Sequence, residues 1–184
     1  MTIRLAQTAD AAAVAAIYGP FCETTAVSFE VAAPDAGEMA ARIDAVTRQY
    51  PWLVLERDGA IAGYAYATRH RDRAAYMWSV DTAVYVDAAA RRTGVGRALY
   101  DKLFTLLVEQ GYFKAYAGIT VPNEASVALH TAVGFTSVGT YHGVGYKLGA
   151  WRDVAWFERR LKPEQSDPSP PRPVHAVLHV LSAE

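Results

Sequence analysis

The stretch Arg91–Tyr100, "RRTGVGRALY", decides how the rest of the chain is interpreted. It follows an alternating run, "SVDTAVYVD" at 79–87, and leads into a run whose leucines recur at helical spacing. Gly94 and Gly96 therefore lie between a predicted strand and a predicted helix. A turn of this kind presents unpaired backbone N–H groups at the positive end of a helix, and phosphate is their usual ligand. We expect an anion site here, although such turns also occur as purely structural connections.

Two well-known phosphate loops do not fit this stretch. A P-loop has Lys followed by Ser or Thr after its second glycine, and this chain does not. The dinucleotide-binding fold has a third glycine where this chain has Leu99 or Tyr100. The loop must therefore belong to another class of anion site, or to none.

Outward from this loop, the sequence alternates short strands with short helices. Asp58-Gly59 is a typical two-residue hairpin turn, and Gly19-Pro20 is expected to interrupt or end the first helix. The predicted strands cover residues 2–6, 52–57, 60–68, 79–87 and 114–121, with two more before Leu161. The predicted helices cover residues 11–21, 35–50, 97–111 and 123–134. This order predicts an α+β fold, an α/β/α sandwich in which helices flank a mixed, mostly antiparallel sheet.

The composition is that of a globular domain with an ordinary charge balance. The 184 residues are enough for one full core and few for two. Eighteen basic against nineteen acidic side chains give a net charge of −1, which argues against nucleic-acid binding by bulk electrostatics. The single cysteine, Cys22, suits a reducing compartment and is more typical of a packed thiol than of a nucleophile. Since neither a signal peptide nor an apolar run of ~18 residues is visible, we expect a cytoplasmic protein that does not engage a membrane.

The composition changes at Pro163. The segment "KPEQSDPSPPRP" is rich in proline and polar residues and is expected to be extended. We therefore expect a folded domain over 1–162 and a Pro-rich tail over 163–184. The last stretch, "VHAVLHVLSAE", is apolar enough to dock on the domain or on a neighbouring subunit, and the sequence favours neither.

Two spaced motifs resemble the GNAT acetyltransferase superfamily. Arg91-x-x-Gly94-x-Gly96 is similar to its pyrophosphate-binding motif, (Gln/Arg)-x-x-Gly-x-(Gly/Ala). Downstream, Asn123-x-x-Ser126-x-x-Leu129-His130-x-x-x-Gly134-Phe135 is similar to its Asn-x-x-Ala-x-x-Leu-Tyr-x-x-x-Gly-Phe helix. The resemblance implies the GNAT fold, with acetyl-CoA as cosubstrate and its pyrophosphate as the anion held by the loop.

Longer stretches narrow the resemblance to the phosphinothricin N-acetyltransferase group. They are "VSFE" (27–30), "YPWLVLERDGAIAGYAYA" (50–67), "RDRAAYMW" (71–78), "TAVYVD" (82–87), "RRTGVG" (91–96) and "GYKLGAWRDVAWF" (145–157). Members of that group acetylate the α-amine of small glutamate analogues such as phosphinothricin and methionine sulfoximine, and they usually form homodimers. The resemblance therefore implies a small amino-acid-like substrate, resistance to such herbicides or antibiotics, and a homodimer.

Acetyl transfer to an amine requires a proton acceptor, stabilisation of the thioester oxygen, and a proton for the departing thiolate. Asp81 is the expected general base, because the family has Glu at the matching strand position and a dry cleft raises the pKa of a carboxyl group. Its side chain is one methylene group shorter, which leaves room for an intervening water. The alternative is a structural carboxylate that pairs with Arg73 or Arg92. Glu23 is a competing base, and solvation of a helix end explains it equally well.

His130 is the expected general acid. It stands where the wider superfamily has the Tyr that protonates the thiolate, and the phosphinothricin group also has His there. The structural alternative is a polar position on a short helix. The resemblance places oxyanion stabilisation on the backbone N–H groups of the 84–86 segment.

The remaining site residues follow from the same resemblance. The expected cofactor-binding residues are Val84, Tyr85, Val86, Arg91, Arg92, Thr93, Gly94, Val95, Gly96, Arg97, Asn123 and Ser126. The expected substrate-binding residues are Glu23, Phe29, Arg71, Arg73, Tyr76 and Val154. Arg71, which replaces a Lys of the family, and Arg73 would hold the acceptor's carboxylate, although a solvated loop also explains them. His70, His142, His175 and His179 show no shared metal spacing, so we expect no metal.

Two other functions stay open at this point. The chain could acetylate a different amine, such as a protein N-terminus, an aminoacyl group or another amino acid. It could also be a non-catalytic coenzyme-A-binding module that has lost turnover through the Asp81 and Arg71 changes.

Overall fold

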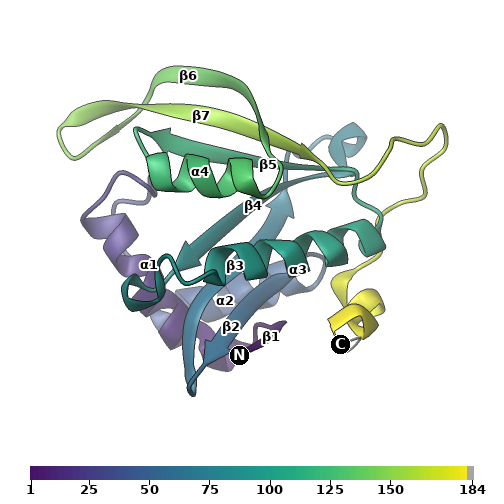
Figure 1. The fold of residues 1–184 in the computed structure, drawn as a ribbon, viewed down its shortest axis with the longest axis horizontal. Coiled ribbons are helices and arrows are strands. Elements are labelled where there is room, and N and C mark those ends of the chain that lie inside the picture. Colours follow the sequence, from purple (N-terminus) through teal and green to yellow (C-terminus); the bar gives the residue numbers. More distant parts are fainter. Residues whose placement is uncertain (182–184) are drawn as a thin grey trace.

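A seven-stranded sheet forms the middle of the computed structural model, which describes residues 1–181 (Figure 1). The strands are β1 (Thr2–Leu5), β2 (Trp52–Arg57), β3 (Ala60–Arg69), β4 (Ser79–Val86), β5 (Lys114–Val121), β6 (Thr136–Lys147) and β7 (Ala150–Arg160). Their spatial order is β1-β2-β3-β4-β5-β7-β6. Neighbouring strands are antiparallel except β4 and β5, which are parallel.

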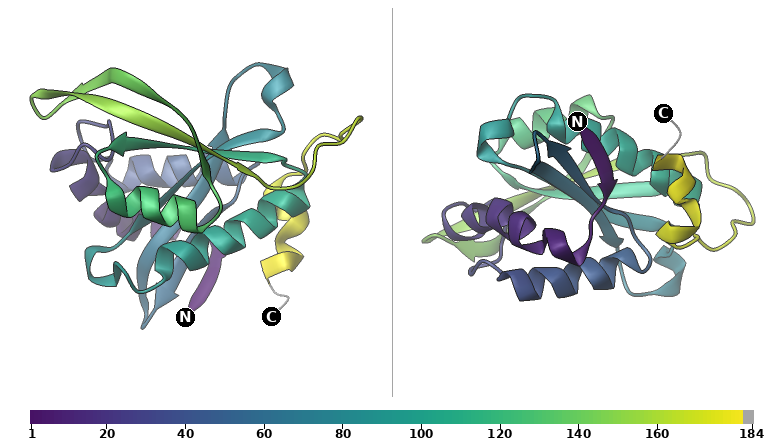
Figure 2. Two further views of the ribbon diagram at one scale, coloured as in Figure 1. Left: turned by 45° about the horizontal axis from the view of Figure 1, so that its top comes forward. Right: turned by 90° about the horizontal axis from the view of Figure 1, so that it is seen from below.

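Helices cover both faces of the sheet (Figure 2, right). The α-helices are α1 (Ala11–Glu23), α2 (Ala36–Thr47), α3 (Val95–Gln110) and α4 (Glu124–Ala132), and the short 3-10 helices are η1 (Thr8–Asp10), η2 (Ala74–Tyr76), η3 (Ala88–Ala90) and η4 (Val174–Leu181). Strand β2 is apolar on both sides, because Trp52 and Val54 pack toward α1 and α2 while Leu53 and Leu55 pack toward α3. The predicted α+β sandwich is confirmed.

The expectation that Gly19-Pro20 interrupts or ends the first helix is wrong. Helix α1 continues through Pro20 to Glu23. A proline inside a helix removes one backbone hydrogen bond, and here burial of Val14 and Cys22, both 0% exposed, holds the helix together across it. Thr24 then caps the end, since its backbone N–H and its hydroxyl both donate to the carbonyl of Pro20.

Strands β4 and β5 pair only at one end. Their register joins Ser79–Asp81 to Lys114–Tyr116, while β4 continues to Val86 and β5 to Val121. Beyond Asp81 and Tyr116 the two strands diverge (Figure 1). The sheet is therefore open in its middle, and Asp81 lies at the vertex of the opening.

The chain after β7 returns to the domain. Arg172 is tied to α3, because Gln110 Nε2 donates to its carbonyl at 2.7 Å. In η4, Val174 and Val177 are fully buried, and Val177 belongs to the core around α3. Of the two docking sites that the sequence left open for "VHAVLHVLSAE", the described part uses the domain itself; residues 182–184 lie outside the described residues.

Candidate functional site

The glycine loop exposes the start of α3. Gly94 is the N-cap residue with φ +87°, and no side chain caps the helix. The first bond within the helix runs from Ala98 N to Gly94 O, so the N–H groups of residues 95–97 have no helical partner. A Cβ added at Gly94 would meet nothing within 4 Å, whereas one at Gly96 would lie 3.0 Å from Leu129 of α4. Gly94 thus leaves open space above free amides, and Gly96 allows α3 and α4 to pack closely.

Some side chains of the loop fix its conformation, and others are exposed to solvent. The Thr93 hydroxyl donates to Ala90 O at 2.7 Å and accepts from Arg57 at 3.0 Å, which fixes the loop. Arg91 is exposed, with its guanidinium 5.3 Å from the ring of Phe21. Arg92 is also exposed and has φ 61°. The other two predicted residues lie in the first turn of α3: Val95 is buried, and Arg97 has its Nε 3.8 Å from Asp101.

A pocket occupies the opening between β4 and β5. It is lined by residues 82–85 of β4, 117–120 of β5, Val27, Asn123, Ser126 and His130. It therefore brings together two of the predicted cofactor-binding strand residues, Val84 and Tyr85, with the predicted residues of α4. Val86 lies beyond this lining and is half-buried beside Gly96.

The contacts of α4 explain its polar residues locally. Asn123 caps the helix, since its side chain accepts from Ser126 N at 3.2 Å. His130 is buried, with Nδ1 2.8 Å from Ser126 O and Nε2 2.8 Å from Tyr100 Oη. Because a carbonyl can only accept, Nδ1 carries the proton and Nε2 accepts from Tyr100. Burial lowers the pKa of His130, which favours this neutral ring.

Asp81 has two partners at the vertex of the opening. Its Oδ1 lies 2.7 Å from His70 Nδ1, and its Oδ2 lies 4.0 Å from Arg71 Nη1. Burial raises the pKa of Asp81, and the contacts with His70 and Arg71 oppose that rise. The alternative in which Asp81 pairs with Arg73 or Arg92 is wrong, because the loop after β3 brings His70 and Arg71 to it instead.

His70 is the residue of this site that sequence reasoning missed. Its ring stacks on Tyr116 with centroids 4.3 Å apart, and the edges of Tyr76 and Trp156 flank it. The sequence analysis considered His70 only as a metal ligand and excluded it in that role. The β3–β4 register, in which Thr68 faces Asp81, would have revealed it, because a residue two positions beyond Thr68 is the diagonal neighbour of Asp81.

Two of the predicted acceptor-binding residues lie beside His70. Arg71 donates from Nη1 to His70 O at 2.7 Å and places its guanidinium over Trp156, 5.6 Å from the ring centroid. Tyr76 is half-exposed in η2. These residues and Asp81 form one cluster.

The side chains of the other predicted acceptor-binding residues have no hydrogen bond, ion pair or ring contact with this cluster within residues 1–181. Arg73 is exposed at the start of η2, and Glu23 is exposed at the end of α1. Neither side chain has a hydrogen bond or ion pair with another residue in the 1–181 range. Phe29 lies directly over Gly145 of β6, and Val154 faces Thr120 across β7 and β5.

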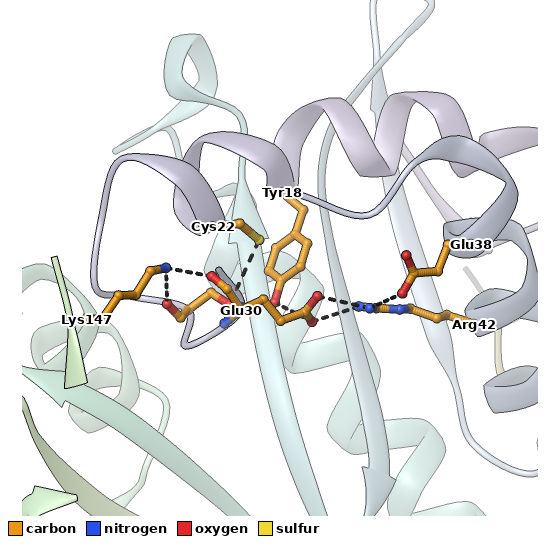
Figure 3. Close-up of polar contacts among 7 residues, drawn as sticks. Tyr18, Cys22, Glu30, Glu38, Arg42 and Lys147 are labelled. Carbon is orange, nitrogen blue, oxygen red and sulfur yellow. Dashed lines mark hydrogen bonds and ion pairs between the residues drawn. The ribbon is translucent and has the colours of Figure 1, made fainter. Parts of the chain in front are cut away.

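The loop before α2 is held by a polar network that the sequence did not suggest (Figure 3). Tyr18 Oη lies 2.7 Å from Ser28 Oγ and donates to Glu30, which forms two bonds to Arg42. The Arg42 guanidinium lowers the pKa of Glu30. On the other side, Lys147 Nζ donates to the carbonyls of Ser28 at 2.6 Å and Glu30 at 2.7 Å. The network ties α1, α2 and β6 to one loop.

The part of the chain that the structure describes contains neither a metal-binding cluster nor a membrane-spanning helix. Across residues 1–181, no group of three or more His, Cys, Asp or Glu side chains is arranged to hold a metal ion. In the same range, every helix is too short or too polar to cross a membrane.

An open mixed sheet, with uncapped backbone N–H groups at a helix start beside its opening, is the arrangement that the GNAT resemblance implies. The chain belongs to the GNAT acetyltransferase family, because a family model described as "Acetyltransferase (GNAT) domain" matches residues 3–156. It is 39% identical to phosphinothricin N-acetyltransferase from Streptomyces viridochromogenes over 97% of this chain and 95% of that one. It is 35% identical to L-methionine sulfoximine/L-methionine sulfone acetyltransferase from Salmonella typhimurium, over 88% and 95%.

The fold is also similar to that of a solved structure from the same group of enzymes. The phosphinothricin acetyltransferase of Sinorhizobium meliloti, in complex with AcCoA, superposes with a TM-score of 0.86 at 34% identity, over 91% of this chain and 92% of that one. The family expected from the sequence is confirmed, and the protein is an N-acetyltransferase of the GNAT type.

Proposed function

We propose that this enzyme transfers an acetyl group from acetyl-CoA to the α-amine of a small glutamate analogue of the phosphinothricin or methionine sulfoximine and sulfone type. The observation that carries the proposal is the extent of the likeness, since relatives named for these acceptors align over 88% to 97% of the chain. That span includes both the glycine loop and the cluster around Asp81.

The glycine loop fits the pyrophosphate of acetyl-CoA. The free N–H groups of residues 95–97 and the exposed Arg91 and Arg92 present donors and positive charge in open space at Gly94. Bound there, acetyl-CoA would supply an activated acetyl thioester. Within the 84–86 segment, the N–H groups that face away from β3, those of Val84 and Val86, stabilise negative charge on the thioester oxygen.

The acceptor amino acid binds beside Asp81. Arg71 and Arg73 hold its carboxylate, and Tyr76 lines the same side. Three further residues complete the acceptor side: Phe29 and Val154 as apolar walls, and Glu23 at its edge. Asp81 acts as the general base that accepts the ammonium proton, and His130 acts as the general acid that supplies the proton for the leaving thiolate.

Assembly and location are part of the same proposal. The hairpin of β6 and β7 exposes apolar side chains, including Tyr146 at 63% and Trp151 at 69%, and these support a homodimer. The buried free thiol of Cys22 supports a cytoplasmic enzyme. The acceptor class supports a role in herbicide or antibiotic resistance.

Thiol release from acetyl-CoA tests the activity. We expect release with phosphinothricin, methionine sulfoximine or methionine sulfone, and none with analogues whose α-amine is blocked. Turnover only with peptide N-termini or ordinary amino acids would favour a different acceptor, and binding of acetyl-CoA without release would favour a non-catalytic module.

An arginine pair tests the proposed carboxylate contact. Arg71→Ala should raise the acceptor KM by about 10- to 100-fold, the loss typical of a charge-assisted hydrogen bond, with the acetyl-CoA KM unchanged. The matched control is Arg69→Ala, because Arg69 is 62% exposed and its ion pair is a distant one, 3.8 Å from Asp72. Equal effects of the two variants would remove Arg71 from acceptor binding.

A further inference from the structure

We propose that His70 is the catalytic residue that receives the proton of the acceptor amine, on Nε2, while Asp81 holds the ring through Nδ1. The inference rests on the proposed function and adds a residue that the family resemblance did not supply. In this proposal Asp81 is no longer the proton acceptor. It orients the His70 ring and stabilises the imidazolium that forms on it.

The hydrogen bond fixes which ring nitrogen is free. His70 Nδ1 and Asp81 Oδ1 are 2.7 Å apart, and an ionised carboxylate can only accept, so Nδ1 carries the proton. Nε2 then keeps its lone pair. No residue of the described chain hydrogen-bonds Nε2, and the His70 side chain is 12% exposed. The base is therefore formed and open before any substrate arrives.

The ring is held rigidly where the acceptor must come. It stacks on Tyr116 at an interplanar angle of 17°, and Tyr116 is the residue that faces Asp81 at the last β4–β5 pair. The charged and titratable groups that face it are Asp81 from β4, Arg71 from its own loop, Tyr76 from η2 and Tyr116 from β5. A base fixed at the vertex of the opening lies next to the pocket between the strands.

Proton affinity favours an imidazole over a carboxylate for this step. An α-amino group ordinarily titrates near 8, an imidazole near 6.5 and an aspartate near 4, so an imidazole is the closer match to the amine, although burial raises the pKa of Asp81. The shorter side chain of Asp81 leaves a gap between its carboxylate and the amine, and His70 occupies the position next to that carboxylate. The resulting imidazolium faces the negative charge of Asp81, which stabilises it.

The step balances without another reactant. An N–H bond of the acceptor ammonium breaks and an Nε2–H bond forms, while the Nδ1 proton stays on His70. The free amine nitrogen then bonds the acetyl carbon as the C–S bond breaks. The nitrogen gives up its second proton to become the neutral amide, and the departing thiolate takes one up. His70 returns its proton to solvent.

Kinetics of paired variants test the assignment. His70→Asn places an amide N–H near the position of Nδ1 and so keeps the bond to Asp81, but it has no Nε2. It should lower kcat by about 10² or more, and the double variant with Asp81→Asn should be no slower than either single variant. His142→Asn is the matched control, because His142 forms a similar pair with Asp153, 2.9 Å apart, on the exposed hairpin. Wild-type-like turnover of His70→Asn would overturn the proposal and leave Asp81 as the direct base.

Two further measurements separate catalysis from support of the fold. Imidazole added to His70→Ala should restore part of the lost turnover, whereas a purely structural role gives no such rescue. Nitrogen NMR of the wild-type ring at neutral pH should show the proton on Nδ1, and Asp81→Asn should weaken that preference. If no acceptor is turned over, the proposed function fails, and the NMR still decides: a proton found on Nε2 would overturn the inference about His70.

Discussion

At the residue scale, His130 shows how partners limit what a side chain can do. Its Nδ1 proton is engaged with Ser126 O and its Nε2 accepts from Tyr100, so the neutral ring presents no free proton to a thiolate. Proton donation from Nε2 of His130 therefore needs a second proton on the ring. Burial opposes the second proton.

The same burial predicts a pH dependence of stability. The pKa of His130 lies below its ordinary 6.5 in the folded chain, so below pH 6.5 the unfolded chain binds a proton that the folded chain does not. The free energy of unfolding should thus fall as pH decreases from 6.5, by at most about 1.4 kcal/mol per pH unit, until the folded pKa is reached. His130→Gln should flatten this part of the Tm profile. The exposed His142→Gln serves as control, and parallel Tm profiles for His130→Gln and wild type would contradict the assignment.

The sequence predicted a residue's role where that residue is part of a motif. It could not predict a contact that depends on the register of two strands. Gly94, Gly96 and Asn123 stand in motifs with a physical reason for each position. The contact between His70 and Asp81 depends on how β3 and β4 align, and no short stretch of sequence contains that information. The sequence therefore identified the carboxylate of Asp81, but the alternative partners considered for it, Arg73 and Arg92, are not the ones that the structure shows.

At the scale of helices and strands, the periodicity of hydrophobic residues predicted most elements of the fold. Leucines at 99, 103, 106 and 107 are all fully buried on α3, and Asp58-Gly59 forms the expected turn with positive φ at both residues. The failure at Pro20 has a clear cause. The local sequence shows only that a proline destabilises a helix. The burial that offsets this destabilisation comes from contacts of α1 with α2 and the sheet.

The start of α3 offers a test of the anion site. Gly94→Asp should weaken acetyl-CoA binding by at least about 100-fold, because its carboxylate would enter the open space above the free amides. Gly59→Asp is the matched control: Gly59 also has positive φ, +79° against +87°, and open space, but it lies in the β2–β3 turn. Both variants should lose similar stability to backbone strain. Calorimetry that found equal acetyl-CoA affinities for the two variants would argue against this loop as the pyrophosphate site.

At the scale of the whole molecule, the chain after β7 contributes to the core. Val177 is fully buried against α3, so Val177→Ala should lower the free energy of unfolding by about 2 kcal/mol and Tm by about 4–8 °C. Val138→Ala is the control, since Val138 is 58% exposed on β6. Thermal unfolding followed by circular dichroism measures both. Equal melting temperatures would mean that η4 does not stabilise the domain in solution.

The ammonium of Lys147 has a mechanical consequence. It is only 6% exposed and reaches from the end of β6 to the carbonyls of Ser28 and Glu30. The hairpin cannot swing away from α1 without breaking these bonds or dragging the 24–35 loop along. The tip of the β6–β7 hairpin and the 24–35 loop are thus mechanically coupled, and a displacement of one is transmitted to the other.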